Sequence, residues 1–295
     1  MTVADRSFFA QPFLALAHRG GALYPPNVGR ENSLHAFGQA VGLGYTHLET
    51  DAHATRDGVL LAFHDDRLDR VTDRTGLVAE LDYDEVREAR IGGTDPIPTM
   101  DEVLEAFPAT YVNIDIKAAQ AIRPLVEVLN RHQAHHRVNV ASFSDERLRD
   151  FRRIAGTQVS TSVGPLGIGW TRMLPPVAKL VAAPGNALQL PHWIDLPEVV
   201  RSLPRPLLAP FAHDLRDGRF RVVTRELVEA AHATGKKVHV WTIDDPAQMH
   251  ELIDLGVDGL VSDRIDVLKD VLVERGLWHD EPPERGHDEP RGAGA

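Results

Sequence analysis

Short apolar runs with strand character alternate with amphipathic helical patterns along almost the whole chain, and this alternation limits the possible folds most strongly. Apart from one hairpin return, eight candidate parallel strands begin near residues 13, 46, 111, 137, 158, 186, 237 and 257. Eight strands with intervening helices over roughly 265 residues come close to the ~250 residues typical of a (β/α)8 barrel. A doubly wound open sheet is the alternative, but residues 18–22 lack the G-x-G-x-x-G turn that it expects. The sequence therefore predicts an α/β protein with a (β/α)8 TIM barrel.

The barrel accounts for most of the chain, so we expect one domain over residues 1–277. Residues 278–295 are rich in proline, glycine and charge, and we expect them to form a disordered tail. A hydrophobic content of 43% and a charged content of 25% support a sizeable core. The chain has no cysteine, which excludes disulfides, thiolate catalysis and Cys-ligated zinc.

Charge and hydropathy limit the partners. The formal net charge of −11 argues against a general binder of nucleic acid or of anionic membranes. Residues 1–11 show no signal peptide, and no apolar run approaches the ~18 residues that span a bilayer. We therefore expect a cytoplasmic protein without stable membrane insertion, and the sequence leaves its oligomeric state open.

The second predicted strand continues into a β-hairpin. Only a few residues separate the runs 46–51 and 59–64, which is too short for a parallel crossover. Counting back from a turn at Asp57-Gly58 places His64 opposite Asp51. Residues 65–98 are polar and irregular, so we expect an excursion from the barrel with one helical patch near residues 84–89.

Two later regions read as loops. Residues 164–170 are apolar and rich in glycine, and a helix follows them that is expected to end near Val181. Residues 191–220 contain five prolines and no clear periodicity, which is typical of a loop.

Polar side chains follow several of the predicted strands, where active sites of barrels gather. The first strand, Leu14–Ala17, ends at His18 and Arg19, which two glycines follow. The other candidates are Glu49 and Asp51 on the second strand, His64 on its hairpin, Asp115 and Lys117 on the third strand, and Trp241 on the seventh.

The acidic residues predict a metal site. Glu49 and Asp51 are two residues apart and therefore share one face of a strand, and Asp115 ends the next parallel strand. Three converging carboxylates repel one another unless a cation lies among them, and an all-oxygen set favours Mg²⁺ or Ca²⁺. The alternative is that Glu49 and Asp51 are strand-end charges paired with a nearby lysine or arginine.

The basic residues beside this site predict acid–base chemistry on an anionic substrate. His18 and His64 form a candidate proton-transfer pair. Arg19 offers a planar fork of donors and Lys117 a point charge, and both suit a phosphate group.

The ordered set of motifs resembles that of glycerophosphodiester phosphodiesterases. It runs from about residue 14 to residue 275, nearly the whole predicted domain. Its motifs are His18-Arg19-Gly20, Glu31-Asn32-Ser33, Glu49-Thr50-Asp51, His64-Asp65, Ile97-Pro98-Thr99, Asp115-Ile116-Lys117, Trp241-Thr242 and Ser262-Asp263. That family folds as a (β/α)8 barrel, needs a divalent cation, and hydrolyses glycerophosphodiesters to an alcohol and glycerol 3-phosphate.

The resemblance implies a role for each candidate. His18 and His64 match the acid–base pair, and Trp241 offers a wall for the glycerol carbons or packs in the core. Metal binding falls to Glu49, Asp51 and Asp115, and phosphate binding to Arg19 and Lys117. Two positions depart from the family pattern: Asp115 is often glutamate there, and Glu31 follows a longer loop, which makes its role less secure.

Two other functions fit the same residues. A lysophospholipase D or sphingomyelinase D-like enzyme shares the barrel and the metal, and Leu166, Ile168 and Trp170 then meet an acyl chain or plug a buried loop. A barrel that only binds phosphorylated ligands has no need of two histidines. Neither water nor the glycerol 2-hydroxyl is favoured as nucleophile, and the two histidines are not told apart as acid and base.

Overall fold

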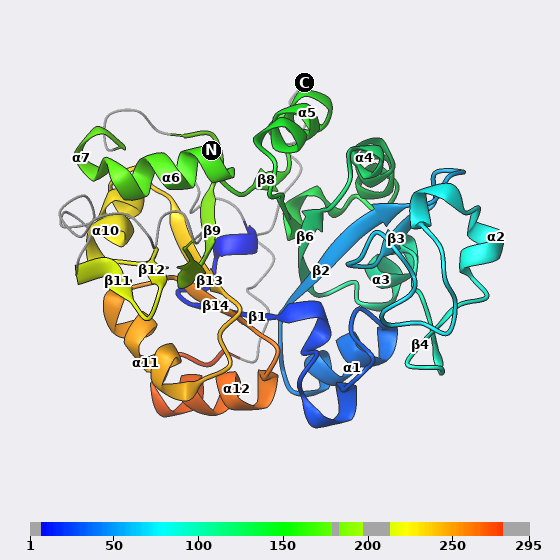
Figure 1. Ribbon diagram of the computed structural model, residues 1–295, viewed down its shortest axis with the longest axis horizontal. Coiled ribbons are helices and arrows are strands. Elements are labelled where there is room, and N and C mark those ends of the chain that lie inside the picture. The colour runs from blue at the N-terminus through cyan, green and yellow to red at the C-terminus, as the bar shows by residue number, and fades with distance from the viewer. Residues whose placement is uncertain (1–6, 179–182, 197–212, 280–295) are drawn as a thin grey trace, which may run out of the picture.

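The computed structural model describes residues 7–178, 183–196 and 213–279, whose main feature is a nearly closed barrel of parallel strands with helices around it (Figure 1). The hydrogen-bonded order is β8-β7-β6-β2-β1-β14-β13-β9. One parallel bridge, from Ser162 to Ala187, links the two ends of this order. The strands are β1 Leu14–Ala17, β2 His47–Ala54, β6 Tyr111–Ile116, β7 Val138–Ala141, β8 Ser160–Thr161, β9 Ala187–Pro191, β13 Lys237–Trp241 and β14 Gly259–Ser262. The predicted (β/α)8 barrel is confirmed.

Capping residues begin most of the surrounding helices. The side chains of Ser33, Thr99, Ser144, Thr224 and Asp245 each accept a hydrogen bond from the backbone N–H three residues later. These residues cap, in order, α1 Leu34–Gly42, α3 Met100–Ala106, α5 Asp145–Ala155, α10 Arg225–Ala233 and α11 Pro246–Leu255. The barrel is completed by α4 Ile122–Arg131 and α12 Ile265–Glu274. Among the residues described, no helix is long and apolar enough to cross a membrane.

An aromatic cluster closes the barrel at the end where the strands begin. A short turn, Ser7–Phe9, buries Phe8 and Phe9 there. The backbone oxygen of Phe8 accepts a hydrogen bond from Nε2 of His47, whose ring stacks on Tyr111 at 4.8 Å. Burial lowers the pKa of His47 and of His239, also buried in the barrel, from 6.5 to about 4. The folded barrel therefore keeps both imidazoles neutral.

The β-hairpin forms, but its predicted register is wrong by one residue. In the structure β3 Leu60–Ala62 pairs with β2, and the N–H of Phe63 donates to the oxygen of Asp51 at 3.0 Å. Phe63, not His64, is therefore opposite Asp51. The reason is that three residues rather than two lie between Thr55 and Val59, and Gly58 supplies the positive φ of 88° that this longer turn needs.

Residues 65–98 form the predicted excursion and pack with the returning strand of the β-hairpin around a small second apolar core. They contain a turn Val78–Glu80, α2 Tyr83–Val86, and a ladder of β4 Arg90–Ile91 with β5 Asp95–Pro96. The buried side chains of this core are Leu61, Phe63, Leu68, Val78, Val86, Ala89, Ile91 and Ile97. We call residues 65–98 the excursion lobe.

The two regions expected to be loops contain regular structure instead. Most of residues 164–170 belong to helix α6 Pro165–Met173, which α7 Pro175–Ala178 follows. Within 191–220, the short strands β10 Trp193–Asp195, β12 Arg219–Arg221 and β11 Leu215–Arg216 form an antiparallel sheet. Pairing between distant segments holds these two- and three-residue strands, so no local periodicity reveals them. The predicted helix end at Val181 and nearly all of the predicted tail lie outside the described residues.

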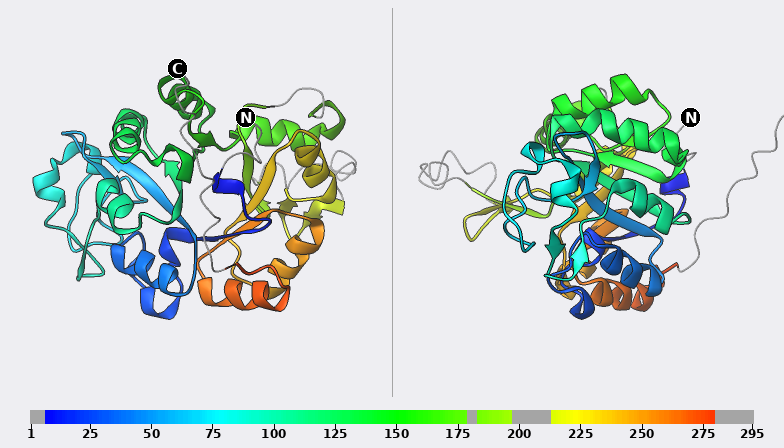
Figure 2. Two further views of the ribbon diagram at one scale, coloured as in Figure 1. Left: turned by 180° about the vertical axis from the view of Figure 1, so that it is seen from behind. Right: turned by 90° about the vertical axis from the view of Figure 1, so that its right-hand side faces the viewer.

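The small sheet and the excursion lobe extend from the same side of the barrel (Figure 2, right). His64 follows the β-hairpin, whereas Ile194 and Phe220 belong to the small sheet. All three line one cavity, so the segment that follows the β-hairpin and the small sheet form part of its walls.

Candidate active site

A cavity of about 640 Å³ brings all of the predicted site residues together. It opens where the barrel strands end, as expected for this fold. Its polar part contains His18, Arg19, Glu49, Asp51, His64, Asp115 and Lys117, and Trp241 also lines it.

A sharp turn after β1 places the first two of these residues. Arg19, Gly20 and Gly21 have φ values of 50°, 84° and 89°, all in the left-handed region. A Cβ atom on Gly20 would lie 2.8 Å from the backbone carbon of Ala36 in α1, so only glycine fits there. The turn also directs the backbone N–H of Arg19 to Oε2 of Glu49, at 3.1 Å.

A carboxylate orients His18. Its Nδ1 lies 2.7 Å from Oδ1 of Asp263, just beyond β14, and its Nε2 lies 3.9 Å from Oε2 of Glu49. Burial alone would lower the pKa of His18, but the negative charge of Glu49 and the hydrogen bond with Asp263 outweigh it and raise the pKa above 6.5. The sequence contained the Ser262-Asp263 motif, but nothing in it assigned this role to Asp263.

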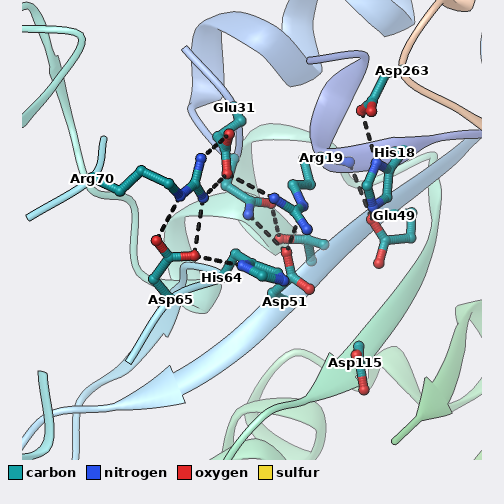
Figure 3. Close-up of polar contacts among 12 residues, drawn as sticks. His18, Arg19, Glu31, Glu49, Asp51, His64, Asp65, Arg70, Asp115 and Asp263 are labelled. Atoms are coloured by element: carbon teal, nitrogen blue, oxygen red, sulfur yellow. Dashed lines mark hydrogen bonds and ion pairs between the residues drawn. The ribbon is translucent and has the colours of Figure 1, made fainter. Parts of the chain in front are cut away.

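A second carboxylate orients His64 and connects it to the phosphate-binding candidates (Figure 3). Nδ1 of His64 lies 2.6 Å from Oδ1 of Asp65, whose other oxygen accepts from Nε of Arg70 at 2.6 Å. Arg70 also donates to Glu31 at 2.7 Å, and Glu31 accepts from Nη1 of Arg19 at 2.9 Å. The hydrogen bond from Arg70 lowers the pKa of Asp65 to about 2, so this carboxylate stays ionised.

Sequence reasoning missed Arg70 and left the role of Glu31 less secure. Arg70 lies in the excursion lobe, where no periodicity or motif marks it. Glu31 belonged to a quoted motif, and the structure places its carboxylate between Arg19 and Arg70.

Cations neutralise two of the three predicted metal ligands. Nζ of Lys117 lies 2.9 Å from Asp51 and 2.6 Å from Asp115, and Nε of Arg19 lies 3.3 Å from Asp51. Although burial favours the protonated form, Lys117 and Arg19 hold the pKa of Asp51 below its usual value. Asp51 thus shows the charge pairing that was the alternative for Glu49 and Asp51, and Asp115 shares the same lysine.

Glu49 differs from Asp51, because burial and the neighbouring charge of Asp51 raise the pKa of Glu49 to about 7. In addition, the buried Oδ1 of Asp115 has no hydrogen-bond partner among the described residues. Within the same residues, no three His, Asp or Glu side chains surround one point as ligands of an ion. The three carboxylates offer only oxygen atoms, which hard cations prefer, but in this structure the positive charge beside Asp51 and Asp115 is supplied by Lys117.

An aromatic pair and a polar floor complete this end of the cavity. The rings of Trp241 and Phe143 meet edge to face at 5.3 Å, and Nζ of Lys117 lies 5.4 Å from the Phe143 ring centroid. On the floor, Oδ1 of Asn113 accepts from Asn139 and from Gln189, each at 2.8 Å. Contact of Trp241 with glycerol carbons stays a prediction.

Most of the remaining cavity wall is apolar, although Ser142, Ser162, Arg172 and Thr242 also line it. It includes Phe143, Val163, Pro165, Ile168, Met173, Leu190, Ile194, Phe220 and Val222. Leu166, expected either to meet an acyl chain or to plug a buried loop, is 77% exposed on α6 and lies outside this lining. The buried-plug interpretation is therefore wrong for Leu166.

The sequence profile of the Glycerophosphoryl diester phosphodiesterase family matches residues 18–267. The chain belongs to this family. It is 39% identical over 266 residues to a Mycobacterium tuberculosis protein named "Probable glycerophosphodiester phosphodiesterase 2", covering 90% of this chain and 92% of that one. The chain is therefore a phosphoric diester hydrolase.

Two further matches complete the comparison. The rat protein "Lysophospholipase D GDPD1" is 28% identical over 288 residues, covering 89% of this chain and 87% of its own. An Oleispira antarctica phosphodiesterase, solved in complex with the product sn-glycerol-3-phosphate, superposes with a TM-score of 0.65 at 20% identity. This alignment covers 90% of our chain and 99% of that one, and it shows a shared fold.

Proposed function

We propose that the protein hydrolyses glycerophosphodiesters to an alcohol and glycerol 3-phosphate, using His18 and His64 as acid and base and one divalent cation, Mg²⁺ or Ca²⁺. One observation carries the proposal: each histidine in the cavity has a carboxylate on its Nδ1, beside two cationic side chains. The product complex of the Oleispira antarctica phosphodiesterase supports the choice of product.

The carboxylates at Nδ1 leave Nε2 of each ring to exchange protons. One histidine takes the proton of the nucleophile as the new P–O bond forms, and the other protonates the alkoxide as the old P–O bond breaks. Arg19 and Lys117 offset charge on the non-bridging oxygens. The nucleophile is water or the glycerol 2-hydroxyl. In the second case a cyclic phosphate forms as the alcohol leaves, and water then opens the ring to glycerol 3-phosphate, with the two histidines exchanging roles.

The cation would be held by Glu49, Asp51 and Asp115. When bound, it supplies Lewis-acid stabilisation of the phosphoryl oxygens. The oxygen-only donor set and the unpartnered Oδ1 of Asp115 support this assignment.

The decisive test screens glycerophosphodiesters with Mg²⁺, with Ca²⁺ and with EDTA, and detects glycerol 3-phosphate. We expect product only when a divalent cation is present. Full turnover after exhaustive chelation and metal-free repurification would refute the role of the cation. Binding of the diesters without any turnover would instead identify a barrel that only binds phosphorylated ligands.

The apolar wall favours a second candidate substrate, a lysophospholipid, whose single acyl chain the residues around Ile168, Met173 and Phe220 can bury. The name of the rat relative is consistent with this activity. Parallel assays on glycerophosphocholine and lysophosphatidylcholine test it. If kcat/KM for the acylated substrate is far below that for glycerophosphocholine, the second candidate is wrong.

A further inference from the structure

Helix α6 has apolar side chains on two of its sides. Pro165, Ile168 and Met173 line the active-site cavity. On the outer side, Leu166 is 77% exposed and Trp170 is 45% exposed. A helix that only covers a barrel is expected to present polar residues to water, so this outer face needs another explanation.

The exposed face continues beyond α6. Residues 166, 170 and 173 share one face of α6, and residue 174 at the break and residue 177 in α7 follow them along the outer edge of the molecule (Figure 1). All five side chains are exposed large hydrophobics: Leu166, Trp170, Met173, Leu174 and Val177. We call this set the apolar lip.

The apolar lip is continuous with the entrance of the cavity. Met173 belongs to both the lip and the cavity lining, and Phe143 and Ile194, also cavity residues, are 59% and 43% exposed. Apolar side chains thus extend from the outer surface into the site. A large exposed apolar patch marks an interaction surface.

We infer that the apolar lip docks on a zwitterionic lipid surface, from which the acyl chain of a substrate enters the cavity. This inference rests on the proposed lysophospholipid hydrolysis. A lipid surface fits better than a protein partner, because the patch leads into a cavity with room for a hydrocarbon chain. Trp170 suits the boundary between lipid and water, where its ring is buried and its N–H stays hydrated.

Charge decides which lipid surface fits. A protein with a formal net charge of −11 is repelled by anionic lipids, so uncharged or zwitterionic headgroups are favoured. A helix of nine residues lies along such a surface and does not cross it.

Co-sedimentation with phosphatidylcholine vesicles tests the lip in the full-length protein. The test variant carries Leu166→Asp and Trp170→Asp, which lie outside the cavity lining, and the control carries Val273→Asp, 56% exposed on α12. We expect wild type and control to bind alike and the test variant to partition roughly tenfold less. Hydrolysis of glycerophosphocholine by the test variant should match wild type, which shows that it is folded.

Three outcomes overturn the inference: no binding of wild type to these vesicles, equal binding of the test variant, or a wild-type dimer that only the lip substitutions dissociate. Vesicle binding is measured without turnover. An enzyme inactive on every glycerophosphodiester therefore refutes the proposed function, and vesicle binding still decides the docking surface.

Discussion

Replacing Lys117 by methionine tests the charge balance of the site. The ammonium group lies within 2.9 Å of Asp51 and 2.6 Å of Asp115, and these two residues are 1% and 5% exposed. Methionine keeps most of the side-chain length and removes the charge. Asp115 then loses its ion-pair partner, whereas Asp51 keeps Arg19.

The expected loss of stability follows from burial. Removing one partner of a buried ion pair costs about 3–5 kcal/mol. Because Arg19 remains and Lys117 is 18% exposed, we expect the lower end, about 3 kcal/mol. At about 2–4 °C per kcal/mol, this cost lowers the melting temperature by roughly 6–12 °C.

Thermal unfolding at pH 8 in EDTA measures this effect, with Lys237→Met as the control. Lys237 pairs with Asp258 at 2.9 Å but is 30% exposed, and His232 also contacts that carboxylate, so we expect at most about 1 kcal/mol. Burial already raises the pKa of Asp115, so the loss should shrink towards pH 5 as this group takes up a proton. A divalent cation should also restore part of the melting temperature. Equal melting of Lys117→Met and wild type in EDTA would refute this reasoning.

Three other predictions concern single residues. His18→Ala and His64→Ala should each lower kcat/KM by ~10²–10⁴ on a substrate with an alkyl leaving group, and a p-nitrophenyl leaving group should rescue only the general-acid variant. Arg70→Met should lower kcat roughly tenfold. In a His64→Ala background the same substitution should change kcat little, because Arg70 acts on His64 through Asp65. Arg67→Met, at an exposed arginine, is the control. Burial depresses the pKa of His47 to about 4, so between pH 6.5 and pH 4 the unfolded chain binds more protons at this residue than the folded chain does. The free energy of unfolding should therefore fall by up to about 3 kcal/mol as the pH is lowered from 6.5 to 4. Urea titrations should show a smaller decrease for His47→Gln than for wild type.

Most of the barrel could be predicted because its signals are local. Each strand is an apolar run of a few residues, and caps such as Ser33 and Thr224 mark where helices begin. The site followed from topology, since side chains at the ends of neighbouring parallel strands meet at one mouth. Asp51 and Asp115, paired in register on β2 and β6, illustrate this.

What the sequence could not predict depends on contacts between distant segments or on loop length. One additional turn residue moved His64 by one position in the hairpin. Trp193 pairs with Arg221 across residues that no periodicity connects. Arg70 reaches Glu31 only because the excursion lobe packs against the barrel, and side-chain geometry of this kind has no signature in one sequence.

The charges of the site couple substrate and cation binding in the proposed mechanism. Lys117 and Arg19 are paired with Asp51 in this structure, and they are also the groups assigned to the substrate phosphate. A bound phosphodiester would compete with these carboxylates for Lys117 and Arg19, and a divalent metal ion held there would compensate the carboxylates that lose a partner. Thermodynamic linkage makes this coupling reciprocal. If the metal ion raises the affinity for the phosphate by some factor, the phosphate raises the affinity for the metal ion by the same factor. The ion pairs of Lys117 are therefore compatible with the proposed metal site, because in that proposal they would belong to the site before substrate and metal bind.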